Sequence, residues 1–173
     1  MLDSNKSELD SLMNRYKEDL SGLATKRQQE QASQDEFMKE FMRLEKEIVW
    51  PVIVDIGNQL NEYGHDYHVS EEDEYVDATA HFQPASITFN IFPATLDRSF
   101  YKPESTPYVQ FIANRYAKKV GIVVSTMMPN IGGVVGAHGE YDLSQMTKEF
   151  VEKEIVEVLK NTLIFHKEEE KQS

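Results

Sequence analysis

The stretch Gly64-His65-Asp66-Tyr67-His68 holds the densest group of side chains that could do chemistry. An imidazole beside a carboxylate can act as an acid–base pair, and histidine is a common metal ligand. On a strand, His65 and His68 point to opposite faces because they are three residues apart, whereas Asp66 and His68 share a face. A metal site needs three or four convergent ligands, so we predict none here. The sequence favours a surface strand with exposed imidazoles, and a turn that brings His65 and His68 together is the alternative.

A second group surrounds His138, in the sequence Gly136-Ala137-His138-Gly139-Glu140. Glycines beside a histidine allow a ligand to approach closely, and Glu140 would share a strand face with His138 as the second half of a general-base pair. A bulged strand or a hairpin end is the favoured interpretation. A further histidine, in the alternating run 77–82, is interpreted as a half-buried or edge residue. The candidate ligand-binding residues are therefore His65, Asp66, His68, His81, His138 and Glu140.

The other residue types limit the chemistry further. The chain has no cysteine, which excludes disulfides, zinc–thiolate sites and thiol catalysis. Ser86, Ser125 and Thr126 lack a nucleophile elbow, and the turn 128–133 lacks the lysine of a phosphate-binding loop. We predict no catalytic residues, no metal ligands and no cofactor.

The composition is that of an acidic domain with a substantial core. Hydrophobic residues make up 40% of the 173 residues, and the nine Phe and eight Tyr suit a sheet packed on helices. The net charge of −12 works against binding to nucleic acid or anionic lipid. The first residues lack the apolar run of a signal peptide, and no apolar stretch approaches the ~20 residues of a membrane span. We expect a cytoplasmic protein that binds neither nucleic acid nor membrane.

Apolar residues near the N-terminus follow the spacing of a coiled coil or helical hairpin. Steps of four and three residues connect the members of this stripe, which we term the arm seam: Leu9, Met13, Tyr16, Leu20 and Leu23. The stripe is narrow and its surroundings are charged, which suits a peripheral or intermolecular helix more than a core helix. Packing on the chain's own domain and capture of a second subunit or protein partner fit this pattern equally well.

The register of the arm seam continues through a polar centre at Arg27, Glu30 and Gln34 and is apolar again at Phe37, Phe41, Leu44 and Ile48. Two structures fit: one long helix, or a turn near residues 32–34 followed by a helix capped by Ser33 and Glu36. The capping chemistry favours the turn, although no Gly or Pro forces one. A frayed arm is a third state, because a lone helix of this length is marginal in water. We divide the chain into an amphipathic helical arm (1–33), a core domain (34–168) and a polar tail (169–173).

Beyond the arm the pattern predicts a helix, a series of strands and a final helix. Pro51 should kink or restart the first helix, and Gly64 should end it. A periodicity of two predicts strands within 65–70, 86–92, 107–116, 120–127 and 134–143 and leaves 75–85 ambiguous, with 75–82 as a possible short strand. Ser144 or Thr147 should cap the last helix. The predicted fold class is α+β: an N-terminal helical arm or hairpin, an antiparallel meander of four to five strands, and a C-terminal helix packed on the sheet.

Two functions fit these features. The first is a non-enzymatic protein-interaction module that forms a homodimer through its helical surfaces. The alternative is a small-ligand-binding domain, or an enzyme, with a cleft between the sheet and its covering helices. The alternative requires at least three of the six candidate residues to converge in one concave pocket.

Overall fold

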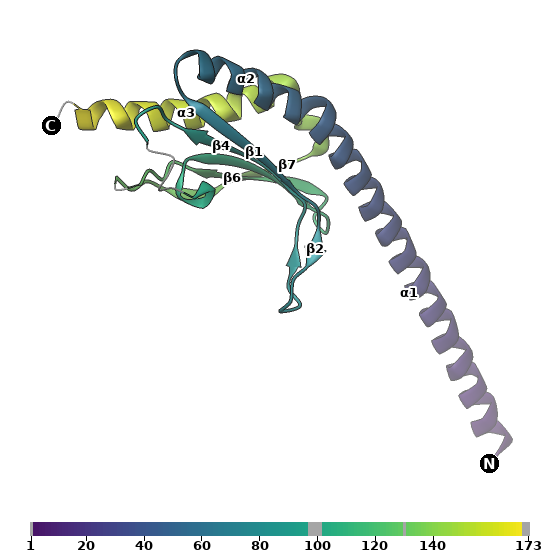
Figure 1. Cartoon of the computed structure of the whole chain (residues 1–173). Coiled ribbons are helices and arrows are strands. Elements are labelled where there is room, and N and C mark those ends of the chain that lie inside the picture. The colour runs from purple at the N-terminus through teal and green to yellow at the C-terminus, as the bar shows by residue number, and fades with distance from the viewer. Residues whose placement is uncertain (1, 97–101, 130, 171–173) are drawn as a thin grey trace. The chain divides into compact units, whose positions relative to one another are not determined.

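The computed structural model of the chain describes residues 2–96, 102–129 and 131–170, with side chains up to residue 163. Its contacts form two units, Met1–Phe37 and Met38–Ser173, and each is described by itself. The first unit consists of most of helix α1 (Asp3–Leu44). The second unit holds a sheet with helices on one face (Figure 1).

Helix α1 runs without a break from Asp3 to Leu44, so the turn predicted near residue 33 is wrong. Two side-chain hydrogen bonds span the expected break. Gln34 Nε2 donates to Glu30 Oε1 (3.3 Å), and Gln31 Nε2 donates to Asp35 Oδ1 (3.0 Å). Polar pairs four residues apart stabilise a helix. Because no Gly or Pro bends the backbone at residues 28–33, serine at position 33 continues the helix instead of capping a new one.

Gly22 lowers the stability of the arm helix. Glycine inside a helix costs ~1 kcal/mol relative to alanine, and a Cβ built on Gly22 meets no atom within 4 Å. We expect Gly22→Ala to raise the free energy of unfolding of the arm by about 0.5–1 kcal/mol, seen as a higher thermal midpoint of the helical circular dichroism signal. Gly132→Ala is the matched control. It also has open space, but its φ of +92° strains an L side chain, so this change should not stabilise the protein.

Pro51 interrupts the helix where the sequence predicts. Helix α1 gives way to a π-helical turn, η1 (Glu45–Val49), and helix α2 (Trp50–Glu62) starts with Pro51 in its first turn. Proline has no N–H to donate to the preceding turn, and the wider π turn accommodates this loss. Helix α2 ends before Gly64, whose φ of +83° provides the left-handed exit from the helix. Both predictions for this segment are confirmed.

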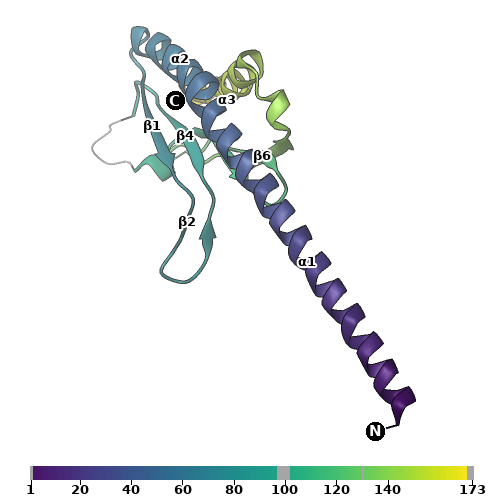
Figure 2. The ribbon, with the colours of Figure 1, turned by 90° about the vertical axis from the view of Figure 1, so that its right-hand side faces the viewer.

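The sheet is the predicted antiparallel meander, with five strands in the order β1-β4-β5-β6-β7. Its strands are β1 (Asp66–Glu72), β4 (Ser86–Phe92), β5 (Tyr108–Asn114), β6 (Lys119–Ser125) and β7 (Val135–Tyr141). The ambiguous segment forms a separate hairpin of β2 (Tyr75–Val76) and β3 (Phe82–Gln83). Figure 2 shows this hairpin extending from the end of the long β1–β4 pair. In Figure 1 it lies on the side of the sheet away from the helices.

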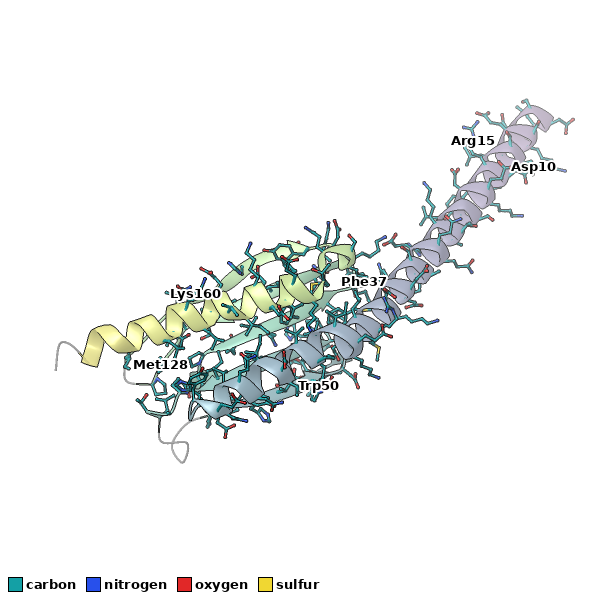
Figure 3. All side chains as sticks on the ribbon, turned by 90° about the horizontal axis from the view of Figure 1, so that it is seen from above. Asp10, Arg15, Phe37, Trp50, Met128 and Lys160 are labelled. Atoms are coloured by element: carbon teal, nitrogen blue, oxygen red, sulfur yellow. The ribbon has the colours of Figure 1, made fainter. Side chains whose placement is uncertain are left out.

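Helices α2 and α3 (Lys148–Glu170) pack against each other over one face of the sheet, as Figure 3 shows from above. Alternation along β5 buries Val109, Phe111 and Ala113 on this face. Thr147 caps α3 by accepting a hydrogen bond from the backbone N–H of Phe150 (3.2 Å). The most deeply buried large side chains come from α2, the central strands and α3, namely Ile53, Ile87, Phe89, Ile91, Phe111, Ile122 and Ile155. The predicted α+β class, with the C-terminal helix packed on the sheet, is confirmed.

An acidic contact joins the π turn to β1. The pKa of Glu45 is raised to about 7, first by burial and then by the carboxylates of Glu71 and Asp73. The ionised form is therefore less favourable in the folded state than in the unfolded state. As the pH rises from the ordinary value of 4.5 to about 7, the folded state binds more protons than the unfolded state, and stability is lost.

We expect Glu45→Gln to stabilise the protein by about 1 kcal/mol more at pH 8 than at pH 5. The full pKa difference corresponds to about 3 kcal/mol, and partial exposure to solvent reduces this value. Urea denaturation at the two pH values measures the effect, with Glu62→Gln on the exposed end of α2 as the control. An equal change at both pH values would show that Glu45 does not carry the pH dependence.

Candidate functional site

The face of the sheet away from α2 and α3 is the first candidate surface, and we term it the open face (Figure 1). The register places side chains from all five strands in rows on it. One row contains His68, Asn90, Tyr108, Ser125 and Val135, and the next contains Ser70, Thr88, Gln110, Val123 and Ala137. Hydroxyls, amides and aliphatic groups therefore mix on the open face, in contrast to the apolar face under the helices.

One cavity on the open face, which we term the larger cavity, has a volume of about 320 Å³. It lies where β5, β6 and β7 meet the root of the β2–β3 hairpin, and its lining includes Phe82, Pro84, Ile112, Tyr116, Val123 and Glu140. Small residues provide the room. Gly121 lies between Ile112 and Glu140 in the register, and a Cβ built on it meets nothing closer than 3.9 Å. A larger side chain at position 121 would therefore enter this cavity.

An ion pair and a ring contact fix the wall of this cavity. Arg115 donates to Glu74 through Nη2 (2.6 Å) and through Nε (3.2 Å), and its side chain is only 17% exposed. This two-pronged contact joins the β5–β6 turn to the root of the hairpin. The rings of Phe82 and Tyr116 meet edge to face with centroids 5.9 Å apart. The hairpin is thus held against the sheet at the cavity.

The smaller cavity, of about 250 Å³, has a polar lining. It lies on the open face beside the 3-10 turn η3 (Pro103–Ser105) and is lined by Ser70, Thr88, Asn90, Pro103, Glu104, Tyr108 and Gln110. Asn90 Nδ2 donates to the carbonyl of Pro103 (2.8 Å) and to Thr106 Oγ1 (3.3 Å), which secures the turn. These two cavities give the open face an apolar recess and a polar recess.

Asp77 organises the tip of the β2–β3 hairpin, where the candidate residue His81 lies. Its carboxylate accepts hydrogen bonds from Thr79 Oγ1 (2.7 Å), from the N–H groups of Thr79 and His81 (2.9 and 3.0 Å), and from Gln83 Nε2 (3.0 Å). These bonds, with that of the Thr79 hydroxyl first, lower the pKa of Asp77 to about 2.

We expect the hairpin tip to depend on the charge of Asp77. A lowered pKa contributes stability above the ordinary value of 3.8 that is lost as the pH falls through about 2. The amide chemical shift of His81 should therefore move toward its disordered value with a midpoint near pH 2, and Asp77→Ala should place it there at every pH. Glu72→Ala, which removes an exposed carboxylate of β1, is the control and should leave this shift unchanged.

The candidate residues near β1 have separate local roles. His65 Nδ1 accepts a hydrogen bond from the backbone N–H of Ala94 (3.0 Å), which ties the start of β1 to the loop after β4. The carboxylate of Asp66 accepts the N–H of Tyr67 (2.7 Å), and His68 is exposed on β1. Of the six candidates, Glu140 alone lines the larger cavity. The structure therefore distributes these six residues over β1, the hairpin tip and β7.

A β-bulge in β7 separates the candidates His138 and Glu140. The register shifts opposite Ile122 and Val123, and Gly139 has a φ of +149°, which confirms the predicted bulge. His138 Nδ1 lies 2.6 Å from Oε2 of Glu154, a buried residue of α3. Glu140 instead accepts a bond from Asn114 Nδ2 (3.4 Å) at the larger cavity. The extra residue of the bulge interrupts the alternation of side chains between the two faces of β7. The imidazole of His138 and the carboxylate of Glu140 therefore lie on opposite faces and do not pair.

The arm seam is the second candidate surface. Its five side chains are between 42% and 56% exposed, and every residue from Leu2 to Ala32 is exposed. Figure 3 shows side chains, among them Asp10 and Arg15, on all sides of this helix. An unburied apolar stripe along a helix is unfavourable in water, because the hydrophobic effect favours its removal from solvent.

Sequence reasoning missed the lining of the larger cavity and the ion pair between Glu74 and Arg115. The sequence feature that could have indicated the cavity is the absence of side chains at Gly121 and Gly139, near the aliphatic Ile112. These residues are far apart in the chain, so only the strand register shows that they are neighbours.

No group of three or more His, Asp or Glu side chains in the described ranges is arranged to hold a metal ion. None of the helices in these ranges is both long enough and apolar enough to cross a bilayer. The chain matches no known family model, no curated protein and no solved structure. Its fold class is α+β.

Proposed function

We propose that this protein is a cytoplasmic, non-enzymatic interaction module that forms a homodimer through the arm seam and presents its open face to another protein. The observation that carries the proposal is the exposure of all five seam side chains on a continuous helix. Full burial of a Leu or Met side chain contributes about 1.5–3 kcal/mol. A second copy offers the same stripe at the same spacing, as coiled-coil pairing requires.

Helix energetics support the same proposal. In proteins most helix stability comes from packing of an apolar face, which the arm lacks, and the arm also contains Gly22. Pairing through the arm seam would stabilise the helix and remove the apolar stripe from solvent at once. The net charge of −12 disfavours nucleic acid as the alternative partner of the arm.

Light scattering on the full chain and on a truncated chain that starts at Gln34 tests this function. The full chain should have twice the 20.0 kDa mass of one copy, and the truncated chain should be monomeric. A monomeric full chain at all accessible concentrations would remove the proposal, and a dimeric truncated chain would move the interface away from the arm seam.

The six predicted residues do not converge in one pocket, so a small-ligand-binding function is the second candidate only at a different site, the larger cavity. Its volume of about 320 Å³ lies at the low end of the ~300–1,000 Å³ of small-molecule sites, which suits a small, mainly apolar ligand or one large side chain of a partner. This cavity lies on the open face and not between the sheet and its helices. The aromatic wall of Phe82 and Tyr116 would provide stacking surface.

Titration with indole, followed by amide chemical shifts, tests the second candidate. Shifts should occur at Ile112, Gly121 and Ala137, and Gly121→Val should abolish them by filling the cavity. Gly136→Val on β7, where a Cβ also has open space, is the matched control and should preserve the shifts. Indole shifts that persist in Gly121→Val would rule out this cavity.

A further inference from the structure

We propose that the two arms pair in antiparallel orientation, with Leu9 of one chain opposite Leu20 of the other. This inference rests on the proposed homodimer and names the orientation and register of its interface. In this register Met13 lies opposite Tyr16 of the second chain, and each arm contributes its whole seam. The occupant of the arm seam is therefore a second copy of the same segment.

Charges within the register of the seam disfavour the parallel orientation. Lys6, on α1, continues the register of the seam three residues before Leu9. A parallel, in-register pair would place Lys6 against Lys6, and farther along it would place Arg27 against Arg27 and Glu30 against Glu30. Like charges held close together in a seam that excludes water destabilise the pair. The antiparallel register places each Lys6 opposite Leu23, where its aliphatic stem can pack and its ammonium can reach water.

Charges beside the seam favour the antiparallel orientation. Asp10 and Lys17 each lie in a four-residue step of the seam, directly after one seam residue and three residues before the next, so both flank the same edge of the stripe. When two helices run in opposite directions, each flanking edge meets the same edge of the other helix. The register that opposes Leu9 to Leu20 brings Asp10 next to Lys17 of the second chain, and it does so twice because of the two-fold symmetry. Flanking charges of this kind set the orientation of paired helices.

The neighbouring antiparallel register is disfavoured by the same flanking residues. Opposing Met13 to Leu23 would bring Lys17 against Lys17 and Asp19 against Asp19 at the two edges of the seam. In a parallel pair, Asp10 would lie near Asn5 and Lys17 near Leu12 of the second chain, so neither gains an opposite charge. Of these three arrangements, only the antiparallel pair that opposes Leu9 to Leu20 satisfies both the seam and its edges.

Distance measurement between spin labels on Ser4→Cys tests the orientation in the full-length chain. The chain has no cysteine, and Ser4 is exposed on the side of α1 away from the seam, so one label is added per copy without contact to the interface. In the proposed register Ser4 lies opposite Thr25, which gives a label separation of roughly 30–40 Å from a rise of ~1.5 Å per residue. A parallel pair would give roughly 20–28 Å, since helix axes are ~10 Å apart and the two labels point outward from them.

Each outcome of this experiment is informative. A separation of roughly 30–40 Å in a dimer supports the proposal, and the short separation in a dimer overturns the orientation while the proposed homodimer stands. A monomer in the same sample overturns the homodimer itself. Charge exchange tests the register: Asp10→Lys and Lys17→Asp should each raise the dimer Kd about tenfold, and the double exchange should restore it. Failure of the double exchange to restore the affinity would overturn the register.

Discussion

Replacing both Met13 and Leu20 by aspartate should convert the dimer to a monomer. In the proposed pair these two side chains lie in the centre of the apolar seam in both copies, so four of them are lost at once. Each replacement removes about 1.5–3 kcal/mol of stabilisation from side-chain burial and introduces a charge into an apolar contact. We expect the dimer Kd to rise by at least about a thousandfold in sedimentation equilibrium.

The control adds the same charges to the outward side of the arm. Asn14→Asp with Ser21→Asp places carboxylates in the three-residue steps of the seam, where a side chain points to the side of α1 away from the stripe. This variant should remain dimeric, and the thermal unfolding of the second unit should be the same in both variants. If the two variants have the same Kd, net charge rather than the seam governs association.

Gly57→Val should destabilise the second unit by about 3 kcal/mol. Gly57 is buried in α2 against the ring of Tyr67 on β1, and a Cβ built on it would lie 2.4 Å from Cε1 and Cζ of that ring. The ring has little freedom to move, because it packs on Phe89 with centroids 5.7 Å apart. Overpacking of this kind forces side chains or backbone to shift, and valine also lowers the helix propensity.

The matched control is Asn58→Val, at the next and exposed position of the same helix. It has the same β-branched side chain without the clash, so it should cost well under 1 kcal/mol. Urea denaturation of the two variants separates the cost of the contact with Tyr67 from the cost of the lower helix propensity of valine. Equal losses of stability would show that helix propensity, and not the contact with Tyr67, controls position 57.

The elements with strong local patterns could be predicted from the sequence. Ser86–Phe92 is the predicted strand residue for residue, since its alternating Ile87, Phe89 and Ile91 fix both the strand and its buried face. The end of α2 at Gly64 and the interruption of the helix at Pro51 follow from the backbone properties of glycine and proline, which few other residues share. The arm was the exception. Capping residues at 33 and 36 indicated a helix start, but they act only where the backbone has already left the helix.

The candidate binding surface was less accessible to sequence reasoning, because it depends on contacts between distant segments. The cavity requires Ile112, Gly121 and Glu140 to be neighbours across three strands, and strand order and register fix this arrangement. The partners Glu74 and Arg115 are 41 residues apart. Simple alternation places His138 and Glu140 on the same face of β7, whereas the bulge places them on opposite faces. The arm seam, by contrast, lies within one helix, so its spacing alone was enough to define it.

Amide hydrogen exchange across residues 9–23, measured at a series of protein concentrations, tests the central claim most directly. If a second copy covers the arm seam, protection of these amides should be high at high concentration and fall on dilution through the dimer Kd, because dissociation leaves a marginal helix. Protection that is independent of concentration would mean that the arm packs on its own chain. The absence of protection at every concentration would mean that no copy covers it, and either result would contradict the homodimer.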